Sequence, residues 1–302
     1  MSGPARRLSP LPLLLIAGLV SAAVAAGAVN ANVLGAGDKF ERLVAKIERF
    51  IIGPPPDRPT VETVTVTARP SIVAPPSSAA PLPSGVTPGP TVPPPVRTAM
   101  DVSIVDDPKA VFAHEIRKDW CAAAGVQMTL AALGRADTTE DFQRTLAGRV
   151  HEWESQRDSR NGEWGPGAMA QALAAYGAPG YEVRAYDSRA DALFDSAVAL
   201  ETTHSPVILL AWRGAHTWVM NGYRADADPA IFPDAKVSGA YILDPWYPWN
   251  SSIWGQSDPP GTFQDAAEMK RNFLPWKRPE GTYPDRDGKF IVVIPTLPAP
   301  AR

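Results

Sequence analysis

A proline-rich segment divides this chain and limits where a folded core can form. Residues 54–97 hold 14 of the chain's 33 prolines, among Ser, Thr, Ala and Gly. Such a composition cannot bury a core, so it predicts a solvated linker over residues 54–99 with polyproline II character. Residues 100–302 are long enough to bury one sizeable core, and we expect a single domain there.

An apolar segment precedes the linker. Residues 11–29 carry no charge and follow Arg6 and Arg7, and their length is close to the roughly 20 residues that span a bilayer. The pattern predicts a membrane anchor or a cleaved signal peptide within residues 1–37, with the domain outside the cytoplasm in either case.

Residues 38–53 should form an amphipathic helix. It could lie on the membrane, pair with a second copy or continue the anchor. At roughly 3.1 Å per residue, the linker could then hold the domain up to ~130 Å from the membrane.

Charge and cysteine content narrow the function. Residues 100–302 carry 20 basic and 27 acidic side chains, a net charge of −7, which argues against nucleic acid or anionic lipid as partners of the domain. The chain has one cysteine, so it has no internal disulfide. An unpaired thiol in an exported protein is either linked to another molecule or kept free for chemistry.

Helical patterns come first in the domain and strand patterns later. The predicted helices cover residues 121–133, 138–150, 166–176 and 189–202, and the predicted strands cover 181–186, 207–212, 216–223, 240–243 and 289–294. This order favours an α+β fold in which helices pack on one antiparallel sheet.

The single cysteine, Cys121, falls where a helix is expected to begin. Asp119 is the predicted N-cap and Gly134 the predicted stop. Unpaired N–H groups and the helix dipole favour a thiolate in a first turn, which makes Cys121 a candidate nucleophile. The alternative is a small buried residue near a helix start, because free cysteine is among the most buried residue types.

A histidine and an aspartate stand at predicted strand ends. His216 opens one strand, and Asp244 closes the next, before Pro245. If these strands are neighbours, Cys121, His216 and Asp244 supply a nucleophile, a base and an acid that fixes the histidine tautomer. Alternatively, His216 is a surface residue at a strand end. The histidines show no metal-ligand spacing, so we expect no metal and no cofactor.

Four sequence blocks follow one another within residues 110–250: WCAAAGVQMTLAALG, GEWGPGAMAQALAAYG, PVILLAWRGAHTWVMNGY and YILDPW. As an ordered set they resemble the papain-like cysteine peptidases that remove double-glycine leaders, peptidase family thirty-nine, in a free-standing bacterial form. The resemblance implies a papain-like fold with the nucleophile at a helix N-terminus. It also implies Cys121 as nucleophile, His216 as general base and Asp244 as orienting acid, with the backbone N–H of Cys121 in the oxyanion hole.

Two positions depart from that family. Glu115 stands where the family usually has a Gln that donates a hydrogen bond to the oxyanion. An ionised carboxylate cannot donate, which could forfeit ~2.7–4 kcal/mol of transition-state stabilisation. Protonation of Glu115, or a neighbour such as His114, could restore the donor. Ala122 and Ala123 follow the cysteine where Gly-Pro is usual.

The sequence therefore predicts an exported, membrane-tethered cysteine peptidase that acts on a peptide or protein. A catalytically impaired papain-like module that binds peptide or cell-wall material is the alternative, and a cell-wall amidase or acyl transferase is a third reading. Trp120, Trp246 and Trp249 are candidates for a substrate groove, although such aromatics could equally seal an irregular loop. The double-glycine leader itself is not inferred as substrate, because no transporter pump accompanies the domain.

Overall fold

The computed structural model describes residues 53–67, 95–160, 164–277 and 280–300. The predicted anchor and the predicted helix over 38–53 lie outside these ranges, apart from Gly53. Within the described ranges, no helix combines the length and apolar composition that crossing a bilayer requires. The described residues from Pro55 onward belong to one compact unit.

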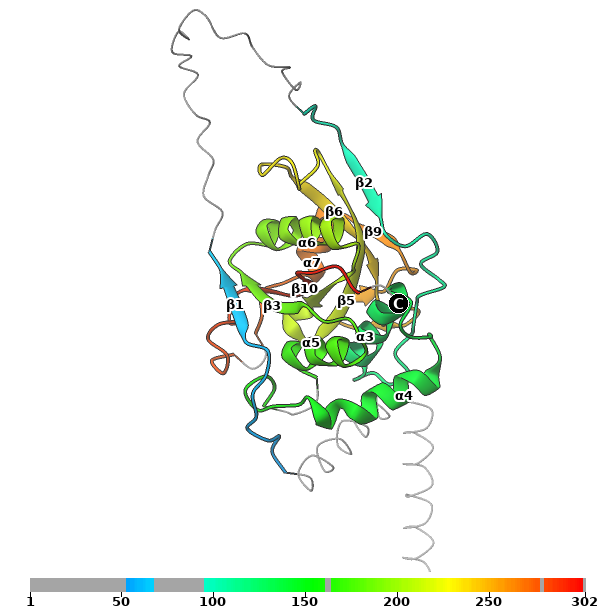
Figure 1. Ribbon diagram of the computed structural model, residues 1–302, viewed down its shortest axis with the longest axis vertical. Coiled ribbons are helices and arrows are strands. Elements are labelled where there is room, and N and C mark those ends of the chain that lie inside the picture. The colour runs from blue at the N-terminus through cyan, green and yellow to red at the C-terminus, as the bar shows by residue number, and fades with distance from the viewer. Residues whose placement is uncertain (1–52, 68–94, 161–163, 278–279, 301–302) are drawn as a thin grey trace, which may run out of the picture. The chain divides into compact units, whose positions relative to one another are not determined.

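The centre of this unit is an eight-stranded sheet (Figure 1). Its strands are β1 (Thr63–Val66), β2 (Met100–Ser103), β3 (Tyr181–Tyr186), β4 (Val207–Ala211), β5 (His216–Ala225), β6 (Val237–Leu243), β9 (Thr262–Gln264) and β10 (Phe290–Pro295). They follow the order β1-β3-β10-β4-β5-β6-β9, and β2 pairs with β5. β1 runs parallel to β3, while the other pairings are antiparallel. A separate two-stranded ribbon joins β7 (Asn250–Ser251) to β8 (Gly255–Gln256).

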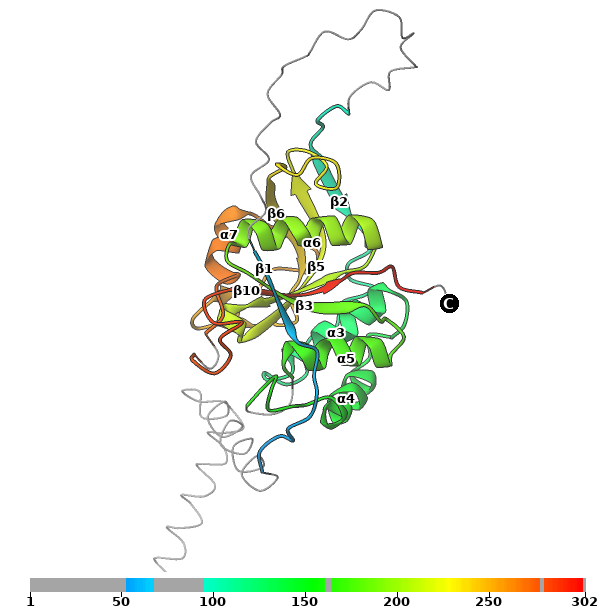
Figure 2. The same cartoon turned by 60° about the vertical axis from the view of Figure 1, so that its left-hand side comes forward.

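Helices cover both faces of the sheet, as Figure 2 shows. The helices are α3 (Cys121–Ala132), α4 (Glu140–Gly148), α5 (Pro166–Ala175), α6 (Arg189–Thr203) and α7 (Ala266–Asn272). β10 shows the two layers directly, because successive side chains of a strand point to opposite faces. Ile291 and Val293 pack in the core under α3 and α5, whereas Val292 and Ile294 pack in the core under α6 and α7.

The prediction of helices on a mainly antiparallel sheet is confirmed.

Local signals account for most helix boundaries. Thr139 caps α4 by accepting a hydrogen bond from the Phe142 N–H, and Gly134 follows α3 with a φ of 63°. The predicted N-cap of α3 is wrong. Trp120 occupies that position without a side-chain cap, since both carboxylate oxygens of Asp119 accept hydrogen bonds from Arg117.

The predicted linker over 54–99 is wrong for its first part. Residues 63–66 form β1 and add a parallel strand to β3. The segment is also held by side-chain contacts: Ser155 donates a hydrogen bond to the Arg58 carbonyl, and Gln171 donates one to the Thr60 hydroxyl. This part of the proline-rich segment belongs to the domain.

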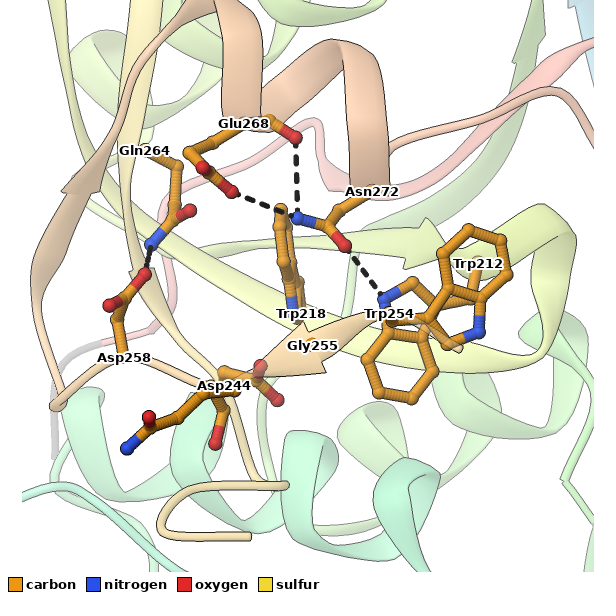
Figure 3. A pocket seen from close by; sticks show the side chains of 11 residues that line it. Trp212, Trp218, Asp244, Trp254, Gly255, Asp258, Gln264, Glu268 and Asn272 are labelled. Atoms are coloured by element: carbon orange, nitrogen blue, oxygen red, sulfur yellow. Dashed lines mark hydrogen bonds between the residues drawn. The ribbon is translucent and has the colours of Figure 1, made fainter. Parts of the chain in front are cut away.

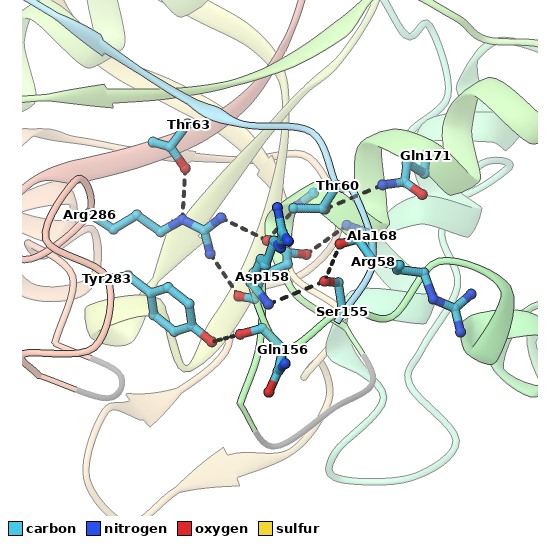
Figure 4. A network of polar contacts seen from close by, with 12 residues as sticks. Arg58, Thr60, Thr63, Ser155, Gln156, Asp158, Ala168, Gln171, Tyr283 and Arg286 are labelled. Carbon is cyan, nitrogen blue, oxygen red and sulfur yellow. Dashed lines mark hydrogen bonds and ion pairs between the residues drawn. The ribbon is translucent and has the colours of Figure 1, made fainter. Parts of the chain in front are cut away.

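A buried ion pair anchors β1 (Figure 4). Arg286 contacts the Asp158 carboxylate at 2.8 Å, and both side chains are at most 4% exposed. The guanidinium also donates to the Thr63 hydroxyl and to the Asp158 carbonyl. Asp158 in turn accepts hydrogen bonds from the N–H groups of Gly167 and Ala168, which open α5. One pair therefore connects β1, α5 and the segment before β10.

Replacing Arg286 with Met should destabilise the protein by about 3–5 kcal/mol, because it leaves the Asp158 carboxylate buried without a cation. Urea unfolding measures the change. The control is Arg144→Met on α4, where the arginine is 53% exposed and pairs with Glu140 and Asp141; we expect less than about 1 kcal/mol there. Equal losses in both variants would contradict the anchoring role.

Candidate active site

A histidine and an aspartate meet at one end of the sheet. His216 is the first residue of β5, and Asp244 directly follows β6. β5 and β6 are antiparallel neighbours in register at Val219 and Leu243, so the start of one lies beside the end of the other. His216 Nε2 lies 2.7 Å from Asp244 Oδ1, and both side chains are buried. The structure brings this predicted pair together.

The contact defines how the imidazole is used. Asp244 Oδ1 also accepts a hydrogen bond of 2.9 Å from the Trp246 N–H, which fixes the carboxylate. When Nε2 of the neutral His216 ring donates to that carboxylate, Nδ1 is the nitrogen without a proton. His216 can then accept a proton at Nδ1.

An indole ring holds the imidazole from one face. Trp212 stacks on His216 with ring centroids 3.9 Å apart and an angle of 18° between planes. Trp212 and Arg213 have positive φ values of 50° and 63°, a conformation that costs on the order of 1 kcal/mol or more for such residues. The Trp212 Nε1–H donates to Asn272 on α7. The strained turn between β4 and β5 therefore positions the ring over His216.

Small residues bring α3 close to β5. Residues 122–125 are Ala-Ala-Ala-Gly, and all are buried. A Cβ on Gly125 would lie 2.4 Å from Thr217 Cγ2, so no side chain fits there. Cys121, the first residue of α3, has its thiol hydrogen-bonded to Thr217. Thr217 follows His216 on β5, so the start of α3 lies against the end of β5 at which the His216–Asp244 pair is found.

The environment of the Cys121 thiol disfavours its ionised form. Burial raises the pKa of the thiol well above its ordinary value, and the Glu115 carboxylate adds to the rise. Hydrogen bonds from Thr217 and from the Ala122 backbone oppose the rise in pKa without cancelling it. The predicted lowering of this pKa by the helix N-terminus is therefore wrong in direction, and the resting side chain is a thiol.

Glu115 is the unexpected residue of the site. Its side chain is fully buried, and neither carboxyl oxygen has a hydrogen-bond partner among the described residues. Burial raises the pKa of Glu115 to about 9, and the charges of Asp244 and Asp119 contribute to the rise. Glu115 is therefore an uncharged carboxylic acid at neutral pH.

The backbone around Glu115 is fixed on both sides. The Glu115 N–H donates to the Pro245 carbonyl, next to Asp244. Gln143 on α4 accepts from the Ile116 N–H and donates to the His114 carbonyl. Sequence patterns gave no signal for Gln143, because this role depends on contacts across the fold.

His114 is engaged elsewhere. Its Nδ1 lies 2.8 Å from the Tyr247 carbonyl oxygen and 3.2 Å from the Pro245 carbonyl oxygen. Carbonyls only accept, so Nδ1 must carry the proton, and Nε2 of the neutral ring cannot donate. The ring also contacts Trp249 edge-on, with centroids 4.3 Å apart.

The three tryptophans considered for a groove are all partly exposed. Trp246 contacts His216 edge-on at 6.3 Å and Trp249 at 5.1 Å between centroids. The Arg117 guanidinium lies over the Trp120 ring, and its central carbon is 5.1 Å from the centroid of that ring. Trp246 thus flanks His216, and Trp249 lies against Trp246 and His114. The contact of these tryptophans with substrate stays a prediction.

A small pocket opens beside Asp244 (Figure 3). Trp218 is buried and lines it with an indole N–H that has no partner among the described residues. Trp212 and Trp254, which stack 5.7 Å apart, line it as well. Sequence reasoning missed Trp212 and Trp218, although both lie within four residues of His216.

No cluster of three potential metal-ligating side chains occurs in the part of the chain that the structure describes.

Comparisons with known proteins add little. No family model and no curated protein matches the chain. One solved structure that matches is the crystal structure of a double glycine motif protease from an AMS/PCAT transporter in complex with the leader peptide. It is 17% identical, with a TM-score of 0.30, over 61% of this chain and 91% of that one. This likeness is too low to assign a family or an activity to the chain.

Replacing Gly125 with Ala should destabilise the fold by about 1–3 kcal/mol, because the added methyl group collides with Thr217. Thr217→Ser removes the colliding methyl group but keeps the hydroxyl, so the double variant should recover most of the loss. Thermal unfolding measures each change. The control is Gly148→Ala, at the end of α4, where an added Cβ meets nothing within 4 Å. If both single variants behave alike, α3 is not packed on β5 as described.

Proposed function

We propose that this protein is a cysteine peptidase or related amide-bond hydrolase that uses Cys121, His216 and Asp244. The observation that carries the proposal is the buried His216–Asp244 contact of 2.7 Å. The Cys121 thiol is hydrogen-bonded to Thr217, the residue that follows His216. A thiol, an imidazole and a carboxylate in this arrangement suit nucleophilic attack on a carbonyl group.

The raised pKa of the thiol determines how attack begins. The thiol keeps its proton at rest, so His216 takes the proton as the sulfur bonds to the substrate carbonyl carbon. Asp244 holds the Nε2–H and stabilises the imidazolium that forms. The imidazolium then protonates the amine that leaves, which yields a thioester on Cys121. Water hydrolyses the thioester with His216 again as base, and the thiol is restored.

The helix start supplies part of the oxyanion site. N–H groups in the first turn of a helix have no partner within the helix and favour negative charge nearby. The backbone N–H of Cys121 stands in that turn. Trp120, Trp246 and Trp249 would line the substrate groove, and the substrate would be a peptide or protein segment.

A second function has its own support. The raised pKa of the Cys121 thiol disfavours catalysis, because little thiolate is present at neutral pH. A module that binds peptide or cell-wall material without turnover is therefore the alternative. Peptide binding that survives Cys121→Ala, with no acylation of the native protein, would select this alternative.

The enzymatic proposal predicts that an activated ester acylates Cys121. N-benzyloxycarbonylglycine p-nitrophenyl ester should give one acyl group per chain in intact-mass spectra, and none in Cys121→Ala. His216→Asn should slow acylation at pH 7 by about 10²–10⁴-fold, because the general base is lost. His151→Asn is the matched control, since that ring is 56% exposed and contacts Glu154. Equal rates in the two histidine variants would refute the role of His216.

The proposed setting is outside the cytoplasm, tethered through residues 11–29. A reporter enzyme that needs disulfides to fold, fused after residue 302 and produced in a bacterial host, should be active. Deletion of residues 1–37 should abolish reporter activity while leaving the amount of fusion protein unchanged. Full reporter activity without residues 1–37 would contradict export through this segment.

A further inference from the structure

We propose that the pocket beside Asp244 binds a hydroxyl group of the substrate, supplied by a serine or threonine side chain in the part of the peptide that leaves first. Trp218 is the residue that recognises this hydroxyl group. The inference rests on the proposed function, because it assigns a specificity to the leaving-group side of the same site.

The pocket has room for one small group (Figure 3). Its volume is about 10 Å³, which corresponds to roughly one water-sized sphere. Gly255 and Gln256 of β8 line it and are both exposed, so the pocket is open to solvent there. A single hydroxyl group can therefore enter, whereas a large side chain or a sugar ring cannot.

A buried hydrogen-bond donor lines the pocket without a partner. Trp218 is 3% exposed, and its indole N–H has no partner among the described residues. In Figure 3 the nitrogen end of this indole points toward Asp244. A buried polar group that stays unpaired destabilises a fold, so this N–H calls for an acceptor. The pocket is the space in which that acceptor can bind.

Asp244 lines the same space with a free acceptor. The hydrogen bonds that its carboxylate accepts from His216 and from the Trp246 N–H both fall on Oδ1. Within the described residues Oδ2 accepts none, so it remains available. A hydroxyl group between Trp218 and Asp244 would accept from the indole N–H and donate to Oδ2.

The two other carboxylates of the lining already have partners. Asp258 accepts a hydrogen bond from Gln264. Glu268 pairs with Arg271 and accepts a hydrogen bond from Asn272. The indole N–H and the free aspartate oxygen are thus the groups that select a ligand.

Hydrogen-bond chemistry excludes the other small groups that a peptide could offer. An ammonium group only donates, so it would leave the indole N–H unpaired. A carboxylate would be repelled by the acids of the lining. A methyl group would leave both selecting groups buried and unpaired. A hydroxyl group satisfies both, and serine and threonine carry one on a short side chain.

The pocket adjoins the imidazole. Trp212, which stacks on His216, and Asp244, which bonds to it, both line the pocket. In the proposed reaction His216 protonates the departing amine, so the part of the peptide beyond the cleaved bond passes this ring. The hydroxyl group therefore belongs to a residue of the leaving part.

Aminolysis measures this side of the site. Cys121 is acylated on the full chain with N-benzyloxycarbonylglycine p-nitrophenyl ester, and a dipeptide amide then competes with water for the thioester. The amine nitrogen bonds to the thioester carbon as the carbon–sulfur bond breaks. His216 takes a proton from the nitrogen and passes it to the sulfur, which restores the thiol. The acceptors are seryl-alanine amide, alanyl-serine amide and alanyl-alanine amide.

We expect one or both serine acceptors to give a ratio of aminolysis to hydrolysis about 10–100-fold above that of alanyl-alanine amide, the effect of a hydrogen bond to a charged group. Trp218→Phe keeps an aromatic ring and removes the N–H, so this preference should fall several-fold. Each ratio is taken within one acyl-enzyme population, so the amount of folded protein cancels.

Trp276→Phe is the matched control. That indole is also buried, and its N–H also lacks a partner among the described residues, but it does not line the pocket. The control should keep the native preference. Equal ratios for the serine and alanine acceptors in the native protein, or the native preference in Trp218→Phe, would overturn the inference.

A binding measurement separates this inference from the proposed function. In isotope-labelled Cys121→Ala, the NMR signal of the Trp218 indole N–H is identified by its loss when Trp218→Phe is added. A serine acceptor should shift this signal, and alanyl-alanine amide should not. If the native protein is never acylated, the proposed function fails, while a serine-specific shift would still support the pocket.

Two outcomes of the NMR titration would overturn the inference. No shift with any peptide would mean that the pocket holds solvent only. A shift with N,N′-diacetylchitobiose and none with the serine acceptors would assign the pocket to a sugar hydroxyl instead of a peptide.

Discussion

The contact between α3 and β5 is the constraint on which the site depends. Gly125 leaves no room for a side chain against Thr217, so the helix lies directly on the strand. Its first residue, Cys121, then contacts the residue that follows His216. The pairing of β5 with β6 adds Asp244. The strand pairing therefore joins His216 and Asp244, which are 28 positions apart in sequence, and the helix–strand contact places Cys121 against the residue next to His216.

The three acidic side chains whose charges act near the thiol differ in their hydrogen-bond partners. Asp244 is bonded to His216, and Asp119 is bonded to Arg117 through both oxygens. Glu115 has no such partner, and burial keeps it protonated. Nucleophilic attack builds negative charge first on sulfur and then on oxygen, and an unpaired anion in the same low-dielectric space would oppose both steps. A neutral Glu115 is therefore the form compatible with the proposed hydrolysis.

Sequence patterns predicted the elements whose signals are local. The helices predicted over 138–150 and 166–176, and the strands that carry His216 and Asp244, all follow from neighbouring residues. The failures involve distant partners. Arg117 binds Asp119, which removes the predicted cap of α3. Burial reverses the expected direction of the thiol pKa. The TVTV stretch of β1 lies among prolines, whose composition favours a linker. Its partner strand β3 lies more than a hundred residues later, so no neighbouring residue indicates the pairing.

The position of β1 also changes what the proline-rich segment can do. β1 pairs with β3, and β2 pairs with β5. Strands β10 and β4 lie between β3 and β5 in the sheet. The residues between β1 and β2 thus begin and end on the same compact unit, and their length cannot separate the domain from a membrane. With an anchor at 11–29, only residues 30–54 remain as the tether. Fully extended, they reach at most roughly 90 Å, and with residues 38–53 helical they reach roughly 55 Å. Both lengths are well below the ~130 Å expected for a free linker, so the site would act closer to the membrane surface than composition alone suggests.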